Sequence, residues 1–154
     1  MDASQGHRRL RTGRRSLAGQ IYIVTTTSFE RRALFADREI AIMASRSIAD
    51  ARAWGDARLL CWVLMPDHWH GLIQLGDDDA LGVVVNRFKS VASKAVRRVE
   101  PGIGPVWARA YHDHALRRED DILAVARYIV RNPVRAGLVE RVGDYPFWDA
   151  IWLS

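Results

Sequence analysis

The chain has 154 residues and a net charge of +5, with 49% apolar and 27% charged residues. These proportions are typical of a globular protein, and no apolar run approaches the ~18 residues that a membrane span requires. The single cysteine, Cys61, excludes an intramolecular disulfide and a cysteine cluster for zinc. Because the N-terminus carries no apolar signal core, we expect a cytoplasmic protein with no membrane partner.

The positive charge is concentrated at the N-terminus. Residues 1–15 hold +4 of the net charge, from five arginines against Asp2: Arg8, Arg9, Arg11, Arg14 and Arg15. Such an arm is typical of proteins that contact nucleic-acid phosphates, although a flexible solubility tail has the same composition. We therefore expect a basic, flexible arm over residues 1–18 and a single domain over 19–154.

The first half of the domain alternates strand and helix patterns. Residues 20–28 are rich in β-branched side chains and predict a strand. Residues 36–54 repeat apolar side chains every three or four positions, with Asp37 as N-cap and Gly55 as terminator, so they predict a helix. Residues 58–65 and 68–75 predict two strands, and the tight connection at Pro66 and Asp67 predicts an antiparallel hairpin.

The second half continues with a helix over residues 81–99, a strand over 106–117 and a helix over 119–131. Asn132 and Pro133 then indicate a kink or the start of a new segment, and the aromatic C-terminal stretch packs back on the body. The order β-α-β-β-α-β-α predicts an α+β fold. We expect a four-stranded antiparallel sheet of ferredoxin-like type, with helices packed on one face.

Two histidines stand in the second strand of the predicted hairpin, in the stretch "MPDHWHGLIQL". His68 and His70 are two residues apart and therefore share one face of the strand. Two adjacent imidazoles can bind a divalent cation, but such a pair is also common as ordinary structure. A second pair, His112 and His114, has the same spacing, and the spacing alone does not decide between them.

The last predicted helix offers a phenol and an amide. Tyr128 and Asn132 are four residues apart, so both border the apolar stripe that packs toward the sheet. An amphipathic rim tyrosine followed by a helix-ending asparagine would produce the same spacing.

A row of cations follows one flank of the predicted helix over residues 81–99. Arg87, Lys94 and Arg98 are spaced by seven and four residues. Such a row suits the tracking of phosphates, and a solvated helix face is the alternative.

Several segments in order resemble the REP-associated tyrosine transposases of bacteria, within the single-tyrosine HUH transposases. They are "GQIYIVTTTSFERRALF", "CWVLMPDHWHGLIQL", "RFKSVASKAVRR", "VWARAYHDHALR" and "YIVRNPVRAGLV" followed by "YPFW". Together they span most of residues 19–150. The spacing between the histidine pair and the tyrosine adds to the specificity of the resemblance.

The resemblance implies a role for each matching residue. His68 and His70 match histidines that hold a divalent metal, which we expect to be Mg²⁺ or Mn²⁺. Asn132 matches a third, amide-bearing ligand, and Tyr128 matches the nucleophile. Asp67 stands where relatives often have asparagine or glutamate, so we assign it no ligand role. His114 matches a histidine common in relatives and is a candidate DNA contact.

The resemblance also implies the reaction. A metal-dependent enzyme of this class cleaves and rejoins single-stranded or hairpin DNA at palindromic repeats, through a 5′-phosphotyrosine intermediate. We expect a nucleoid-associated monomer rather than a homodimer, although related transposases can assemble their sites across a dimer. Two alternatives stay open: an inactive or domesticated DNA-binding protein of the same fold, and a hydrolase of another phosphodiester in which Tyr128 only packs.

Overall fold

The structure, a computed structural model, describes residues 18–117 and 120–153. In these residues one antiparallel sheet has five strands in the order β4-β1-β3-β2-β5. The strands are β1 (Ile21–Thr27), β2 (Arg58–Met65), β3 (His68–Gln74), β4 (His112–Ala115) and β5 (Trp148–Ala150). The helices are α2 (Arg38–Ala49), α3 (Leu81–Val99), α4 (Ile122–Val130) and α5 (Asn132–Arg135). The arginines predicted to form the basic arm lie outside the described residues.

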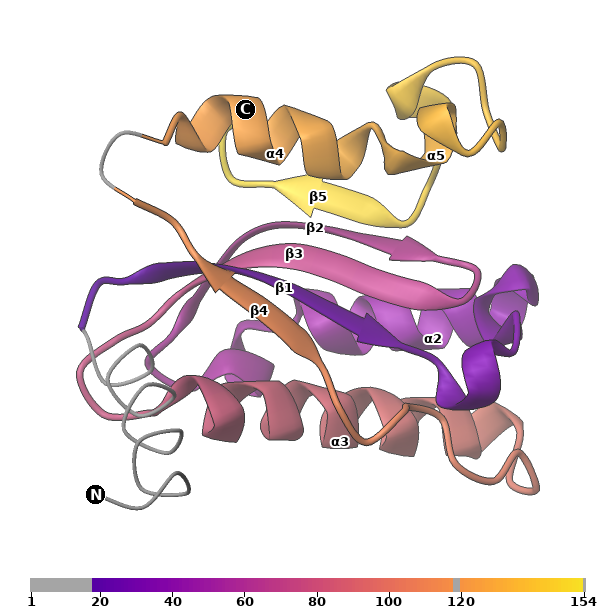
Figure 1. The fold of residues 1–154 in the computed structure, drawn as a ribbon. Helices are drawn as coiled ribbons and strands as arrows, with labels where there is room; N and C mark the ends of the chain where they lie inside the picture. Colours follow the sequence, from indigo (N-terminus) through magenta and orange to yellow (C-terminus); the bar gives the residue numbers. More distant parts are fainter. Residues whose placement is uncertain (1–17, 118–119, 154) are drawn as a thin grey trace.

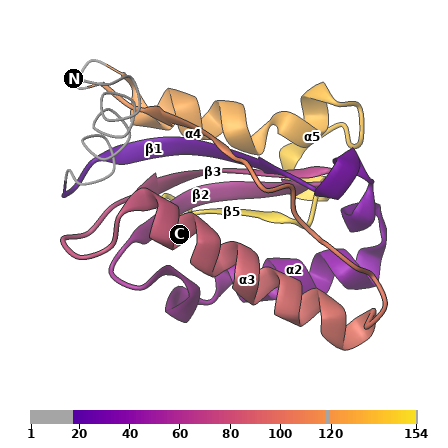
Figure 2. The ribbon, with the colours of Figure 1, turned by 60° about the horizontal axis from the view of Figure 1, so that its bottom comes forward.

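The sheet forms the middle of three layers. Helices α2 and α3 cover one of its faces, and α4 and α5 cover the other (Figure 1). The same layering is visible in Figure 2, where the strands run between α4 and α3. Among the described residues, no helix is both long and apolar enough to cross a bilayer.

Short-range signals set the element boundaries. The Asp37 carboxylate caps α2 by accepting a hydrogen bond from the Ile40 amide at 3.1 Å. Gly55 ends the turn after α2 with φ of 62°, which favours glycine. The β2–β3 hairpin closes so that Met65 lies opposite His68. Asp121 caps α4 through the Ala124 amide, also at 3.1 Å.

Aromatic side chains fill the space between the sheet and helices α2 and α3. Trp69 on β3 lies 4.5 Å from Phe88 on α3 between ring centroids, and Trp54 lies 5.0 Å from the same Phe88 ring. All three side chains are almost completely buried. Gly71 makes room for this stack, because a Cβ at that position would lie 2.6 Å from the Trp69 ring. This side of the sheet is therefore a tightly packed core.

A smaller apolar cluster lies between the sheet and α4. Ala126 and Ile129 of α4 pack there with Leu72 of β3 and with Val63 and Met65 of β2. On β3 the side chains alternate, so Trp69 and Ile73 enter the aromatic core while Leu72 enters the α4 cluster. Side chains two residues apart on a strand point to the same face, so His68 and His70 lie with Leu72 on the face that α4 covers.

The α+β class and the antiparallel sheet are confirmed, with two differences of detail. The sheet has a fifth strand, β5, which pairs with β2 and places Trp148 opposite Val63. Helices also cover both faces rather than one. The sequence of β2 is a continuous apolar run, which is typical of a strand that is buried on both faces. A strand with one face in solvent would instead alternate apolar and polar residues. Three residues of β5 are too few to show any period.

The last predicted strand is shorter than expected. Residues 106–117 alternate, but ladder pairing with β1 is limited to β4. Upstream of β4, Trp107 makes an isolated bridge with Ser28, and its indole donates to the Lys89 carbonyl at 3.1 Å. The Ala108 amide also donates to the Thr27 carbonyl at 2.9 Å, so this segment touches the end of β1 and leaves the ladder only between Trp107 and β4.

Candidate active site

The His68 ring is oriented by the residue before it. Its Nδ1 lies 2.9 Å from Oδ1 of Asp67, and Oδ2 of Asp67 lies 3.1 Å from the Arg31 guanidinium. Partial burial alone would raise the pKa of Asp67, but the hydrogen bond with His68 and the charge of Arg31 hold it below its ordinary value. Asp67 is therefore an ionised carboxylate that fixes the His68 ring.

The His70 ring is oriented from the neighbouring strand. Thr25 of β1 lies opposite His70, and its Oγ1 is 2.5 Å from Nδ1 of the ring. Burial lowers the pKa of His70 to about 4, and electrostatic interactions with His68 and Arg135 lower it further. The imidazole is therefore neutral at neutral pH, which is the form that binds metal ions.

The histidine pair fits a divalent cation. In both rings Nδ1 contacts a protein oxygen, from Asp67 or Thr25, which leaves Nε2 of each ring for a ligand. Across residues 18–117 and 120–153, no group of three or more histidine, cysteine, aspartate or glutamate side chains is arranged to hold a metal. Any further ligand must be of another kind, such as an amide, a phosphate or water.

Tyr128 lies on the exposed side of α4. Its neighbour Ile129 is completely buried against the sheet, whereas Tyr128 is 60% exposed. This orientation follows from the helix, since Ala126 and Ile129 form the apolar stripe and Tyr128 borders it. The phenol is thus open to a large substrate.

Arg135 contacts Tyr128 and also acts electrostatically on His70. Its guanidinium carbon lies 3.7 Å from the centre of the Tyr128 ring, and Nη1 donates to the Tyr128 carbonyl at 2.6 Å. The same guanidinium is near enough to lower the pKa of His70. Tyr128, Arg135 and His70 therefore belong to one electrostatic neighbourhood within one chain.

Asn132 is the first residue of α5 and follows Tyr128 by one helical turn. Pro133 at the start of α5 is buried and is compatible with a helix there because the first turn needs no amide donor. Arg131 between the two helices keeps helical dihedrals, so the helical path continues from Tyr128 to Arg135. Asn132 is half-buried, and no side-chain hydrogen bond holds its amide among the described residues.

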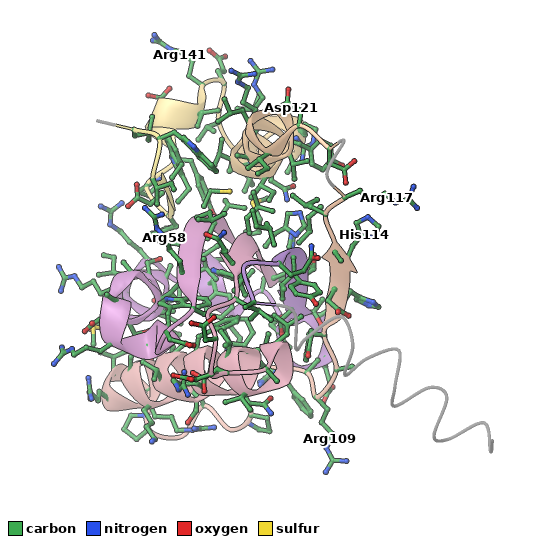
Figure 3. The ribbon with its side chains drawn as sticks, turned by 90° about the vertical axis from the view of Figure 1, so that its left-hand side faces the viewer. Arg58, Arg109, His114, Arg117, Asp121 and Arg141 are labelled. Atoms are coloured by element: carbon green, nitrogen blue, oxygen red, sulfur yellow. The ribbon has the colours of Figure 1, made fainter. Side chains whose placement is uncertain are left out.

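The histidines of β4 lie at the edge of the same face. His112 lies opposite Thr25, and His114 lies opposite Ile23, which packs into the α4 cluster. Both imidazoles are exposed, and Figure 3 shows His114 projecting from the edge strand. A row across three strands thus consists of His112, Thr25 and His70. Of its two histidines, His70 is partly buried and His112 is exposed.

The structure does not bring the predicted cation row of α3 to this site. Arg87 donates to Asp79 at 2.9 Å and is partly buried. Lys94 and Arg98 are exposed, but α3 covers the opposite face of the sheet (Figure 2). A phosphate contact at Lys94 or Arg98 stays a prediction, for DNA that is distant from Tyr128.

Sequence reasoning missed Thr25 and Arg135. Arg135 continues the Tyr128–Asn132 edge by three residues, so helical spacing was a usable signal, obscured by the proline at position 133. No local pattern identifies Thr25, because its role depends on the pairing of β1 with β3. Arg31 likewise reaches Asp67 only through the fold.

The comparisons with known proteins identify the class. Residues 17–132 match the family model described as "Transposase IS200 like", so the chain belongs to the IS200-like transposase family. This match confirms the resemblance that the motifs indicated.

Individual relatives within and around this family show how far the sequence similarity extends. The chain is 32% identical over 88 residues to the REP-associated tyrosine transposase of Escherichia coli K12, which covers 56% of this chain and 50% of that protein. It is 28% identical to an uncharacterized Haemophilus influenzae protein, covering 47% and 52%. The chain thus spans about half the length of these curated relatives.

A solved structure supports the fold. A REP-associated tyrosine transposase bound to a REP hairpin matches with a TM-score of 0.65 and 23% identity, over 86% of this chain and 78% of that one. This likeness confirms the α+β architecture.

Proposed function

We propose that this chain cleaves and rejoins single-stranded or hairpin DNA by forming a covalent bond between Tyr128 and a 5′ phosphate. The observation that carries the proposal is the placement of an exposed phenol beside Arg135, which also acts on His70. A relative of similar fold is bound to a REP hairpin, which supports palindromic hairpin DNA as the substrate.

The reaction needs a nucleophile and a means to offset charge. Oη of Tyr128 attacks the phosphorus, and the bond between the phosphorus and the 3′ oxygen breaks. The leaving 3′ oxygen takes up a proton and becomes a 3′ hydroxyl. The phenol proton passes to solvent or a base. Because the phosphotyrosine bond conserves the energy of the phosphodiester, attack by a 3′ hydroxyl rejoins strands without a nucleotide cofactor. Arg135 is placed to bind the phosphate beside the ring.

His68, His70 and Asn132 are the residues that would hold a divalent cation. The free Nε2 atoms and an unengaged amide form a mixed nitrogen and oxygen set that suits Mg²⁺ or Mn²⁺ once phosphate and water oxygens are added. A cation held by these residues would supply Lewis-acid polarisation of the scissile phosphate. The Asp67 carboxylate accepts from Nδ1–H of His68 and so favours the tautomer with an unprotonated Nε2, and the Thr25 hydroxyl positions the His70 ring.

A monomer that acts in cis is part of the proposal, because one chain carries all four residues on the same side of its sheet. The histidines come from β3, and Tyr128 and Asn132 come from α4 and α5 on the same side of the sheet. Mixing a Tyr128→Phe protein with a His68→Ala protein should therefore restore no cleavage. Restored cleavage would show a site assembled across two chains.

The decisive experiment incubates the protein with a labelled DNA hairpin that carries single-stranded flanks, in Mg²⁺ or Mn²⁺. We expect a protein–DNA adduct that survives denaturation and that is lost in Tyr128→Phe. Tyr111→Phe is the matched control, since Tyr111 packs with the aromatic core on the other face. His68→Ala and a chelator should each reduce the adduct strongly.

Two other results would contradict the proposal. Cleavage without any adduct would indicate a hydrolase in which Tyr128 only packs. Tight hairpin binding with neither cleavage nor adduct would indicate an inactive DNA-binding protein.

A further inference from the structure

A groove runs along the outer side of α4 and α5, next to Tyr128. It encloses about 820 Å³, and Tyr128 forms part of its wall. Its charged lining consists of four arginines and one glutamate, namely Arg127, Arg131, Arg135, Arg141 and Glu140. Because arginines outnumber the acid by four to one, the groove is strongly cationic and adjoins the proposed nucleophile.

The arginines of this groove are largely free of internal partners. All four are exposed. In the described part of the chain no carboxylate pairs with Arg127 or Arg131, and Arg141 makes only a long 3.9 Å contact with the exposed Asp144. Figure 3 shows Arg141 at the outer surface of this layer, pointing away from the sheet. Exposed guanidinium groups that stabilise no internal carboxylate are available for an anionic ligand.

The arrangement follows from the sequence. Arg127, Arg131 and Arg135 recur every four residues, and the helical path continues through Arg131. They therefore form one stripe with a spacing of about 6 Å along the helix axis. The groove thus offers a line of bidentate phosphate donors beside an exposed aromatic ring.

We propose that this groove binds the phosphates of the single-stranded DNA that flanks the bond attacked by Tyr128. A cationic groove with an aromatic side chain is the pattern that proteins use for single strands, where the groove follows the backbone and the ring stacks on a base. The inference rests on the proposed function, since it assigns to the groove the strand next to the reacting phosphate. Arg135 serves the reacting phosphate, and Arg127 and Arg131 hold the phosphates beyond it.

The test measures binding of a hairpin with single-stranded flanks against salt concentration, using fluorescence anisotropy. We expect the double variant Arg127→Gln/Arg131→Gln to reduce the slope of log K against log salt by about 1.4, or about 0.7 for each lost contact. The control is Arg46→Gln, an exposed arginine of α2 on the opposite face, which should keep the wild-type slope. Thermal unfolding verifies that each variant is folded.

A second DNA identifies the segment that is bound. With a blunt hairpin that lacks flanks, the double variant and the wild type should have equal slopes. An equal loss of slope on both DNAs would overturn the inference, because the arginines would then bind the duplex stem. An unchanged slope on the flanked hairpin would also overturn it.

The outcome is separable from that of the proposed function. If the wild type forms no covalent adduct but the double variant loses slope on flanked DNA, the groove binds single strands and the nucleophile assignment fails. If the adduct forms and the slope is unchanged in the double variant, the nucleophile stands and the groove assignment fails.

Discussion

Arg87 and Lys89 on the α3 side of the sheet differ from Arg127 and Arg131 on the α4 side, although Lys94 and Arg98 of α3 are exposed as well. On the α3 side Arg87 pairs with Asp79 at 2.9 Å, and Lys89 donates to the Ala108 carbonyl at 2.8 Å. On the α4 side Arg127 and Arg131 are exposed and have no ion pair among the described residues. Cations of the first kind stabilise the fold, whereas those of the second kind are free for a ligand.

The apolar packing differs in the same sense. The α3 side contains the aromatic stack of Trp54, Trp69 and Phe88, while the α4 side contains a smaller cluster and keeps two imidazoles and a phenol. The α3 side therefore holds most of the buried aromatic packing, whereas the α4 side holds the residues of the proposed site. The following predictions test that division.

The largest effect concerns acid stability. The pKa of His70 falls from 6.5 to about 4 on folding, so between these values the unfolded chain binds a proton that the folded chain does not. The free energy of unfolding should therefore decrease as the pH falls from about 6.5 to 4, by at most about 3 kcal/mol. Urea titrations in a chelator at several pH values measure this. His70→Gln should remove the dependence, with the exposed His114→Gln as control.

Arg135→Gln should slow adduct formation with Tyr128. The change removes the guanidinium that is proposed to bind the reacting phosphate, and loss of one charge-assisted hydrogen bond of about 1.5–3 kcal/mol in the transition state corresponds to about 10–100-fold in rate. Single-turnover kinetics at saturating DNA provide the measurement. Arg135→Lys should recover part of the rate because the charge is kept. A normal rate in Arg135→Gln would separate Arg135 from the chemistry.

Thr25→Val should weaken cation binding by about 10–100-fold, because the hydroxyl at Nδ1 of His70 is lost. Titrating Mn²⁺ by calorimetry measures the affinity. The adjacent Thr26→Val is a matched control, since the Thr26 hydroxyl is buried without a hydrogen bond and lies on the other face of β1. Equal losses in both variants would contradict the orienting role of Thr25.

Gly71→Ala should destabilise the protein by about 1–3 kcal/mol, because the added Cβ meets the Trp69 ring at 2.6 Å. The midpoint of thermal unfolding measures the change. Gly102→Ala is the control, since nothing lies within 4 Å of a Cβ at Gly102. We expect the metal affinity per folded molecule to be unchanged in Gly71→Ala, because the Trp69 ring lies on the other face of the sheet from the histidines.

The smallest effect should come from the exposed flank of α3. The double variant Lys94→Gln/Arg98→Gln should change the slope of log K against log salt for hairpin binding by less than about 0.7, which is the value for one phosphate contact. A larger change would place DNA on both sides of the sheet. It would also show that the cation row predicted from the sequence is part of the interface.

Much of the fold could be predicted from local sequence patterns. The bounds of β2 and α3 match the predicted ranges, because a continuous apolar run and a helical stripe are both local signals. The β3 histidines could be assigned to a shared face for the same reason. Strand β5 could not be predicted, since it is held by pairing with β2 and by the Tyr145 hydroxyl, which donates to the Leu64 carbonyl at 2.6 Å.

The sequence by itself determined the order of the elements, the placement of His68 and His70 on one face of a strand, and the helical spacing of Tyr128 and Asn132. Periodicity sets these relations along one element. Only the tertiary structure decided that α4 and α5 cover the histidine face, that Thr25 orients His70, and that α3 covers the other side. Such relations join residues from separate elements, and their positions follow from how the two faces of the sheet bury their apolar side chains.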